Sequence, residues 1–372
     1  MSEGQPGLGG VVVYVTSHGF GHLHRTAAVL NQIPADVPIT VKSHSDLFQG
    51  WRERLKRPAA LAHYVSDVGA VNPPGDSAAV DPTATIERAI VAHAQAMAGL
   101  DLEADWLRDH HARVVLADAP AVPLAAARRA GVPAYLMSNF TWADIYAPYA
   151  EKMGPTARRF VADLRKVYRQ AEGLFRVEPA LQMSWMPRRE TLGMVVNRGQ
   201  NRGDELRQSL GLDPECRIVY AYLGRYGQAN LDWGRLERYA DRGVHFVAYH
   251  GAAGASPANL HVVPSEHWPG GDLIASSDAV LAKAGYGTVT EAMASGAPII
   301  YPPRADFAEY RALDRALRAW GGAAPISSRD FQAFKLDRAL ARALEARPGP
   351  APFPVDGAEV IARRLVDPQP RR

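Results

Sequence analysis

The sequence has 372 residues, of which 47% are hydrophobic and 22% charged, with a formal net charge of +3 at pH 7. This composition is typical of a globular protein, and the near-balanced charge, without a basic stripe interleaved with aromatics, counts against a nucleic-acid-binding protein. The length exceeds one ordinary hydrophobic core and predicts two domains. Cys216 is the sole cysteine. An intrachain disulfide is therefore excluded, and we expect a cytoplasmic protein without a signal peptide or a transmembrane segment.

The first half of the chain alternates short, apolar, β-rich runs with helical patterns. Strands are predicted at residues 11–16, 38–43, 113–118 and 132–139. A helix is predicted from about His22 to Ile33, and another over 121–131 that ends at Gly131. Strands separated by helices in this way indicate parallel βαβ units. Residues 68–82 predict a long loop rich in turn residues, and loops of that length are often functional.

The second half repeats the alternation, so the sequence predicts an α/β protein with two doubly wound, Rossmann-like domains. Strands are predicted at 217–224, 245–251, 260–264, 279–285 and 298–303. We place the first domain at 1–182, the second at 192–347, and a tail at 348–372 whose last helix packs back on the first domain. Ligands bind such sheets at the carboxyl ends of their strands, so a cleft between the two domains is the expected site.

A turn with two glycines and three histidines follows the first predicted strand. Gly19 and Gly21 allow the backbone to approach a ligand closely. On the following helix His22 and Arg25 share one face, and His24 points elsewhere, as a structural or solvent-facing residue. An imidazole titrates near neutrality and is suited to taking a proton from a hydroxyl. His22 is the first candidate for this base and His18 the competitor.

Asp118 ends the predicted strand 113–118 and opens at the same edge of the sheet. A carboxylate there would fix the tautomer of a histidine base and stabilise its imidazolium form. The alternative is a helix N-cap, which Pro120 fits well. Phe140 and Trp142 follow a later strand and form either an acceptor wall or plain core.

A second glycine turn spans residues 283–287 and precedes a predicted helix. Gly285 and Gly287 leave room for a ligand, the helix start favours a diphosphate, and Lys283 adds a positive charge. Thr288 and Glu291 also have the spacing of a capping box, which only completes a helix, so the spacing alone leaves both interpretations open. Upstream, Gly224 and Arg225 either line the same diphosphate or form an ordinary turn.

The order Lys283-x-Gly285-x-Gly287-Thr288-x-x-Glu291, followed by Gly296-x-Pro298 and Pro303, resembles the donor site of GT-B glycosyltransferases. Lys283 stands where that family usually has histidine. The resemblance implies that the glycine turn holds the donor diphosphate and that Glu291 binds the ribose hydroxyls. It further implies that Trp268 stacks on the nucleobase and that Asp306 and Glu309 lie near the donor sugar. It also supports His22 as base with Asp118, and His18 near the sugar or phosphate.

Residues 18–25, 68–89, 139–149 and 283–293 together resemble the glycosyltransferase-like N-terminal region of plant L-arabinokinases and its free-standing bacterial relatives. The similarity is spread from about Val11 to Tyr310. We find no kinase-type glycine-rich ATP loop, so arabinose kinase activity is not expected.

The sequence therefore predicts an enzyme that transfers a sugar from a nucleotide-sugar donor to a hydroxyl of a small-molecule or glycan acceptor, with inversion. Because no Asp-x-Asp pair occurs, we expect no obligatory metal, and no cofactor beyond the donor. Two other classes stay open: an isomerase of the sugar-nucleotide 2-epimerase type, and a non-catalytic nucleotide-sugar-binding module. The donor base, the sugar, the acceptor and the oligomeric state are not predicted.

Overall fold

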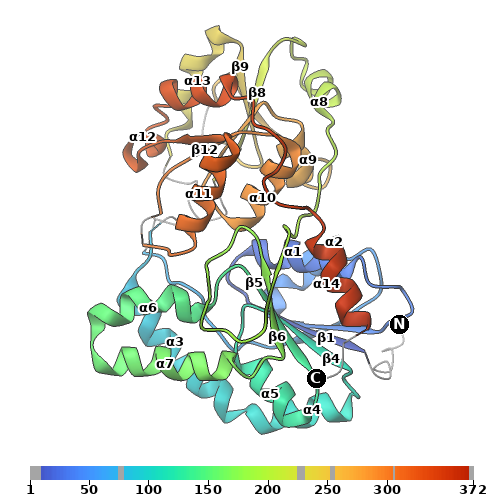
Figure 1. Ribbon diagram of the computed structural model, residues 1–372. Helices are drawn as coiled ribbons and strands as arrows, with labels where there is room; N and C mark the ends of the chain where they lie inside the picture. Colours follow the sequence, from blue (N-terminus) through green and yellow to red (C-terminus); the bar gives the residue numbers. More distant parts are fainter. Residues whose placement is uncertain (1–9, 74–78, 224–230, 252–255, 305, 368–372) are drawn as a thin grey trace. The chain divides into compact units, whose positions relative to one another are not determined.

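The computed structural model describes residues 10–73, 79–223, 231–251, 256–304 and 306–367. The chain forms two compact units (Figure 1). The first comprises Met1–Val71, Val80–Val195 and Phe353–Arg372, and the second comprises Asn72–Ala79 and Val196–Pro352. In each unit strands alternate with helices along the chain.

The first unit is built on a seven-stranded parallel sheet in the order β3-β2-β1-β4-β5-β6-β7. Its strands are β1 (Val11–Val15), β2 (Ile39–Ser43), β3 (Ala60–His63), β4 (Val114–Asp118), β5 (Ala134–Ser138), β6 (Gly173–Val177) and β7 (Arg189–Leu192). Its helices are α1 (Phe20–Leu30), α2 (Phe48–Arg54), α3 (Pro82–Ala98), α4 (Leu100–Asp109), α5 (Val122–Ala130), α6 (Trp142–Met153), α7 (Pro155–Tyr168) and α14 (Gly357–Val366), with a 3₁₀ turn η1 (Ser45–Leu47). Every residue of β1 and β4 is buried, as expected for central strands covered on both faces.

The order of strands reverses between β1 and β4. From β1 the chain moves outward to β2 and β3, whereas β4 to β7 extend on the other side. The last residues of the two strands, Val15 and Asp118, are paired in register. In open parallel sheets this switch point, at the carboxyl ends of the strands, is where ligands bind.

The second unit has a six-stranded parallel sheet in the order β10-β9-β8-β11-β12-β13. Its strands are β8 (Arg217–Tyr222), β9 (Val244–Ala248), β10 (Leu260–Val262), β11 (Ala279–Ala282), β12 (Ile299–Tyr301) and β13 (Ala323–Pro325). Its helices are α8 (Gly203–Leu210), α9 (Gly270–Ala275), α10 (Tyr286–Ser295), α11 (Tyr310–Trp320), α12 (Ser328–Gln332) and α13 (Asp337–Glu345), with the 3₁₀ helix η2 (Trp233–Arg242). Its switch point lies between β8 and β11. One side of the sheet packs on a core that includes Trp233, Phe246 and Phe334.

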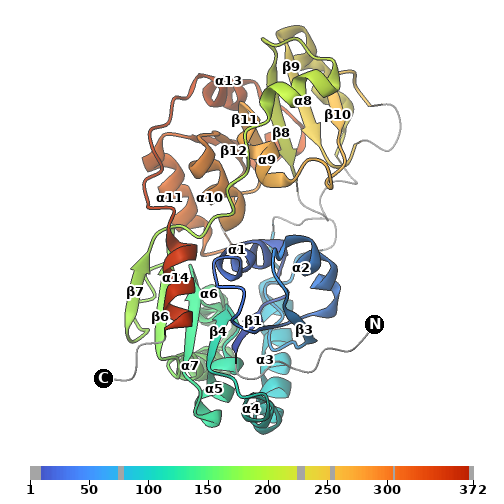
Figure 2. The same ribbon diagram turned by 90° about the vertical axis from the view of Figure 1, so that its right-hand side faces the viewer.

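The nine predicted strands are all present, and four others were not predicted: β3, β6, β7 and β13. The first unit continues beyond residue 182, because β7 joins its sheet and the unit ends at Val195. Helix α14 belongs to the first unit (Figure 2). It packs against α1, and Arg364 Nη2 lies 3.0 Å from Glu190 Oε1 on β7.

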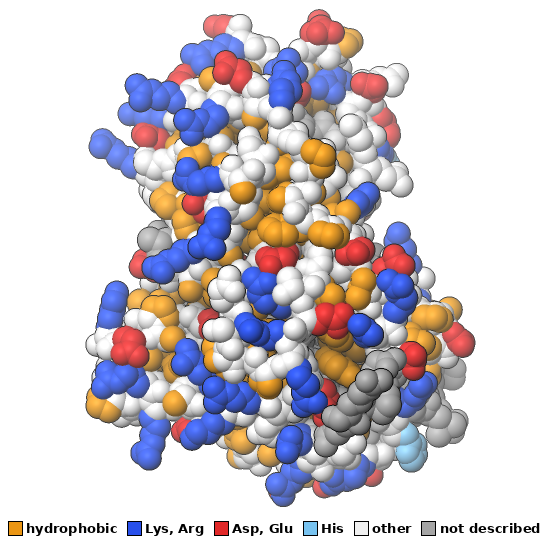
Figure 3. Space-filling model, in the orientation of Figure 1, with side chains coloured by type: hydrophobic (Ala, Val, Ile, Leu, Met, Phe, Trp, Pro, Cys, Tyr) orange, Lys and Arg blue, Asp and Glu red, His pale blue; other side chains and the backbone are white. Residues whose placement is uncertain are grey.

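Two surface properties bear on function. On the face drawn in Figure 3, Lys and Arg side chains are interspersed with Asp and Glu rather than gathered in one basic stripe. Within the described ranges, no helix is both long and apolar enough to cross a membrane.

Candidate functional site

The loop between β1 and α1 brings the first histidine cluster to the switch point of the first sheet. Gly19 is the N-cap of α1 and has φ 85° and ψ 162°, a conformation that is essentially restricted to glycine. It lets the chain turn sharply from the strand into the helix. The helix therefore begins at Phe20, two residues earlier than predicted, and His22 lies in its first turn.

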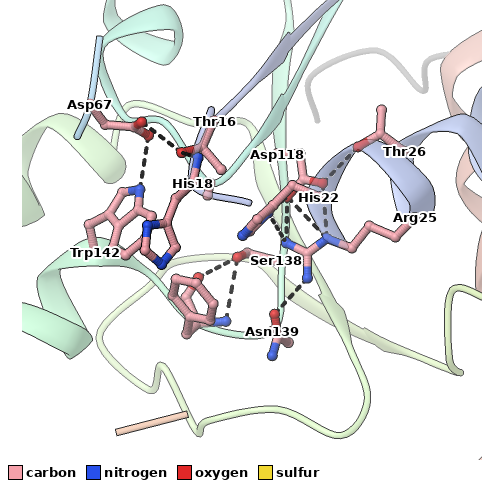
Figure 4. Close-up of polar contacts among 12 residues, drawn as sticks. Thr16, His18, His22, Arg25, Thr26, Asp67, Asp118, Ser138, Asn139 and Trp142 are labelled. Atoms are coloured by element: carbon pink, nitrogen blue, oxygen red, sulfur yellow. Dashed lines mark hydrogen bonds and ion pairs between the residues drawn. The ribbon is translucent and has the colours of Figure 1, made fainter. Parts of the chain in front are cut away.

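His22 and Asp118 are brought together, as Figure 4 shows. His22 Nδ1 lies 2.9 Å from Asp118 Oδ1, and Asp118 is completely buried. Arg25 Nε donates to Asp118 Oδ2 at 2.9 Å, and Thr26 Oγ1 donates to the same oxygen at 2.6 Å. A second guanidinium nitrogen, Arg25 Nη1, donates to Asn139 Oδ1 at 2.6 Å. Asp118 is thus the centre of a network drawn from α1, β4 and the end of β5.

The helix-cap alternative for Asp118 is wrong. Helix α5 begins at Val122, its N-cap is Ala121, and no side chain caps it. The carboxylate of Asp118 instead points toward α1. Burying a carboxylate costs free energy unless hydrogen bonds and an opposite charge compensate for its desolvation. At Asp118 the donors from His22, Arg25 and Thr26 supply this compensation.

The network keeps Asp118 ionised. Burial by itself raises the pKa of Asp118, but the charge of Arg25 and the hydrogen bonds from Arg25 and His22 hold it well below its ordinary value. An ionised Asp118 accepts the proton of His22 Nδ1, so the lone pair of the neutral imidazole is on Nε2. Arg25 Nη2 also lies 3.1 Å from His22 Nδ1. A guanidinium N–H can only donate, so this contact is not a hydrogen bond in the Nδ1–H tautomer that the Asp118 carboxylate selects.

A second carboxylate, that of the half-buried Asp67, lies beside this network. It accepts from Thr16 Oγ1 at 2.7 Å and from Trp142 Nε1 at 2.9 Å. Burial raises the pKa of Asp67, and the hydrogen bonds from Thr16 and Trp142 oppose that shift. The sequence analysis missed Asp67. Its one available signal was an acidic residue directly before the long loop predicted to be functional.

The two aromatic candidates are core residues. Phe140 and Trp142 are 2% and 1% exposed. Their rings nevertheless contact the histidines: Trp142 packs edge-to-face on His18, and Phe140 on His22. They support the two imidazoles from within the protein. His24 is half-buried, and burial, with the nearby charge of Arg54, lowers its pKa to about 3.

The second glycine turn lies at the switch point of the second sheet. Lys283 directly follows β11, and Gly285 is the N-cap of α10 without a side-chain cap. The capping-box alternative for Thr288 and Glu291 is therefore wrong, because the helix begins at Tyr286. A Cβ added to Gly285 would meet no atom within 4 Å.

Charged side chains gather next to this turn. Burial, together with the charge of Arg304, lowers the pKa of Lys283 to about 8, and Glu309 opposes the shift. Arg304 follows β12, is 8% exposed, and was not predicted. Glu309 is buried, whereas Asp306 is exposed, so the two predicted acidic residues have different surroundings. A buried arginine and a half-buried lysine beside a helix N-terminus are suited to an anionic ligand.

Four further residues were predicted for the donor site. Trp268 is 4% exposed, and the guanidinium of Arg202 lies 4.2 Å from its ring centroid, so one face of the indole is covered. Gly287 lies in the first turn of α10. Gly224 and Arg225 lie outside the described residues. Among the residues that are described, no group of three or more His, Cys, Asp or Glu side chains is arranged to hold a metal ion.

Two doubly wound parallel sheets on one chain are the architecture of the GT-B fold, and the chain has this fold. No family model matches it. Three of the similar solved structures are the kitacinnamycin glycotransferase, the Phytolacca americana UGT2 complexed with UDP-2-fluoroglucose and pterostilbene, and the spinosyn rhamnosyltransferase SpnG complexed with thymidine diphosphate. Their identities are 19%, 17% and 16% and their TM-scores 0.65, 0.60 and 0.61; each alignment covers 96% of this chain and 95%, 94% and 95% of theirs.

In sequence, the chain is 29% identical over 332 residues to L-arabinokinase of Arabidopsis thaliana. The alignment covers 85% of this chain but only 30% of that protein, so the chain spans about a third of the length of the relative. The resemblance to GT-B glycosyltransferases and to part of L-arabinokinase is confirmed.

Proposed function

We propose that the protein is a glycosyltransferase that moves a sugar from a nucleotide-sugar donor to a hydroxyl acceptor. We propose a hexose as the transferred sugar. The observation that carries the proposal is the hydrogen bond between His22 and the buried, ionised Asp118 at the switch point of a GT-B sheet. Such a pair is a general base with its orienting carboxylate.

In the proposed reaction, His22 Nε2 takes the proton of the acceptor hydroxyl while that oxygen attacks the anomeric carbon. The bond between the anomeric carbon and the diphosphate oxygen breaks, and the nucleoside diphosphate leaves with the electron pair. Asp118 stabilises the imidazolium that forms. One displacement from the face opposite the leaving group inverts the anomeric configuration.

On the donor side, we propose that Lys283, Arg304 and the amide groups at the start of α10 stabilise the departing diphosphate. Glu291 and Trp268 remain proposed contacts of the ribose and the base, and His18, Glu309 and Asp306 of the sugar or the acceptor. These cations supply charge where other enzymes use a metal, so we expect neither a metal nor a further cofactor. The lone, buried Cys216 fits a reducing compartment, and we expect the protein in the cytoplasm.

The test begins with a thermal-shift screen of UDP, dTDP, GDP and CDP, because a ligand bound only by the folded state raises its stability. The solved relatives hold UDP-2-fluoroglucose and thymidine diphosphate, so UDP and dTDP are the first probes. The matching nucleotide sugars are then incubated with and without a panel of hydroxyl acceptors, and nucleoside diphosphate release is measured.

Acceptor-dependent release supports a transferase. Formation of an epimer from the nucleotide sugar alone would instead indicate an isomerase. Nucleotide binding without either reaction would indicate a binding module. His22→Ala is the control: it should remove turnover and leave nucleotide affinity unchanged, and a variant with equal turnover would exclude His22 as the base.

A further inference from the structure

The backbone of His18 is fixed by a hydrogen bond just after the end of β1. The backbone N–H of His18 donates to Thr16 Oγ1 at 3.3 Å. The same hydroxyl donates to Asp67 Oδ1 at 2.7 Å. Because the Thr16 proton is committed to the carboxylate, its lone pair faces the His18 amide. Asp67 therefore orients the hydroxyl that fixes the start of the loop.

The His18 ring is clamped from two sides. On one side Ala70 N–H donates to His18 Nδ1 at 3.3 Å, and a Cβ added to Gly69 would lie 2.3 Å from that nitrogen. Glycine at 69 is thus required for the close approach. On the other side the ring packs on Trp142, with centroids 5.2 Å apart and planes at 89°. The indole is fixed in turn by its Nε1–H, which donates to Asp67 Oδ2 at 2.9 Å.

These contacts determine the tautomer of His18. A backbone N–H can only donate, so His18 Nδ1 must carry the lone pair and Nε2 the proton. His22 has the reverse arrangement, because its Nδ1 donates to Asp118. A histidine whose lone pair is already used by the backbone has no second lone pair to accept a proton from a substrate.

The rings of His18 and His22 pack on neighbouring aromatic side chains, Trp142 and Phe140, which also contact each other. The ring centroids of His18 and Trp142 are 5.2 Å apart, those of Trp142 and Phe140 5.1 Å, and those of Phe140 and His22 5.9 Å. All contacts are T-shaped, so each ring is fixed by the edge or face of the next. Both histidines belong to one short segment at the switch point of the first sheet.

We propose that the two histidines divide the work: His22 accepts the proton, and His18 donates a hydrogen bond from Nε2–H to an oxygen of the bound substrate. Asp67 is the positioning residue that acts on His18 through Thr16 and Trp142. The inference rests on the proposed function. The oxygen belongs either to the nucleotide sugar or to the acceptor, since both present lone pairs to an N–H donor.

The first test needs no substrate, so it stands apart from the proposed function. The full chain is labelled with ¹⁵N-histidine, and long-range ¹H–¹⁵N spectra are recorded near pH 7.5. Spectra of H18Q and H22Q assign the two rings. The expected result is a proton on Nε2 of His18 and on Nδ1 of His22. A proton on Nδ1 of His18 would overturn the inference, whereas a proton on Nε2 of His22 would instead remove the proposed base.

The second test makes the same substitution at both positions. The side-chain amide of glutamine retains an N–H donor near the place of Nε2 but is not a base. With the nucleotide sugar that gives turnover, H18Q should reduce kcat/KM by no more than about tenfold, the scale of one hydrogen bond. H22Q should reduce it by about 10²- to 10⁴-fold, the scale of general base catalysis. Equal losses in the two variants would overturn the division of roles.

H18F removes the donor and keeps an aromatic ring. An increase in KM for the nucleotide sugar assigns the oxygen to the donor, and an increase in KM for the acceptor assigns it to the acceptor. H18F with native kcat and KM for both would refute the hydrogen bond.

The positioning role is tested at Thr16. T16V retains the shape of the side chain and loses the hydroxyl, whereas T16S retains the hydroxyl. We expect T16V to give mixed tautomers at His18 and a raised KM, and T16S to restore the native histidine signal. A native signal and KM in T16V would show that the link from Asp67 through Thr16 does not position His18.

Discussion

The substitution of Asp118 by Asn tests the central pair most directly. The amide oxygen can still accept from Thr26 and Arg25, but the negative charge is lost. An amide N–H next to His22 would donate to Nδ1, which moves the imidazole proton to Nε2. The lone pair needed for the reaction would then face the wrong way. For an orienting carboxylate changed in this manner, a loss in kcat of about 10³- to 10⁴-fold is expected.

The same substitution should lower stability, because Arg25 is 3% exposed and would lose its counter-ion. Removing one partner of a buried ion pair costs about 3–5 kcal/mol, and the retained hydrogen bonds place D118N near the lower figure. For a unit of roughly 200 residues, 3 kcal/mol corresponds to a decrease in Tm of about 6–12 °C.

The loss of stability also has a defined dependence on pH. The folded pKa of Asp118 is lowered, so its contribution is fully present above the unfolded value of about 4. That contribution decreases as the pH falls through the lower folded pKa. The difference in stability between the native chain and D118N should therefore be constant from about pH 5 to 8 and shrink in more acidic solution.

The assay combines thermal unfolding with nucleoside diphosphate release. H22Q is the matched control, since it leaves the pair of Asp118 and Arg25 intact and should lose turnover with little change in Tm. Because the two groups act as one unit, H22Q/D118N should be no slower than H22Q alone. Folded D118N with turnover within tenfold of the native chain would refute the assigned role of Asp118.

Three further predictions concern the glycine turn after β1, the proposed anion site at Lys283 and the requirement for a metal. G19A should lower the free energy of unfolding by about 1–3 kcal/mol in urea titrations, because Gly19 has a φ of 85°. G21A should be neutral or stabilising, because an added Cβ at Gly21 meets no atom within 4 Å. Equal losses of stability in the two variants would contradict this reasoning. The affinity for the nucleoside diphosphate should fall above pH 8, by up to about tenfold per pH unit, because Lys283 loses its proton there. K283M should abolish this pH dependence. A pH profile of K283M parallel to that of the native chain would exclude Lys283 from the anion site. Turnover should be unchanged in excess EDTA, and a loss that Mg²⁺ restores would show a metal requirement.

The strands that the sequence predicted are those with a strong local signal. β1, β4 and β11 are central, fully buried and apolar, so hydrophobic runs reveal them. β3 and β7 are edge strands with exposed residues, and their extended conformation depends on pairing with a neighbour. The sequence analysis placed the domain boundary between residues 182 and 191, and the first unit extends to Val195.

Part of the candidate site could be predicted because some of its residues lie at or near the ends of strands that are recognisable in the sequence. His22 and Asp118 were identified because the ends of β1 and β4 have recognisable positions in the sequence. Arg25 was noticed, but its role in holding Asp118 ionised was not. Asp67 and Arg304 carry no motif, and Asp67 lies 51 residues from Thr16 and 75 residues from Trp142, the groups that it contacts.

The sequence by itself determined the alternation of strands and helices, the two turns where a strand gives way to a helix, and the kind of chemistry that their side chains offer. These properties depend on neighbours along the chain, through hydrophobic periodicity and glycine. Only the tertiary structure decided which partner the Nδ1 atom of each histidine meets. Those partners are Asp118, 96 residues from His22, and Ala70, 52 residues from His18. Such partners meet because sheet pairing and loop packing join distant segments, and no local pattern encodes that meeting.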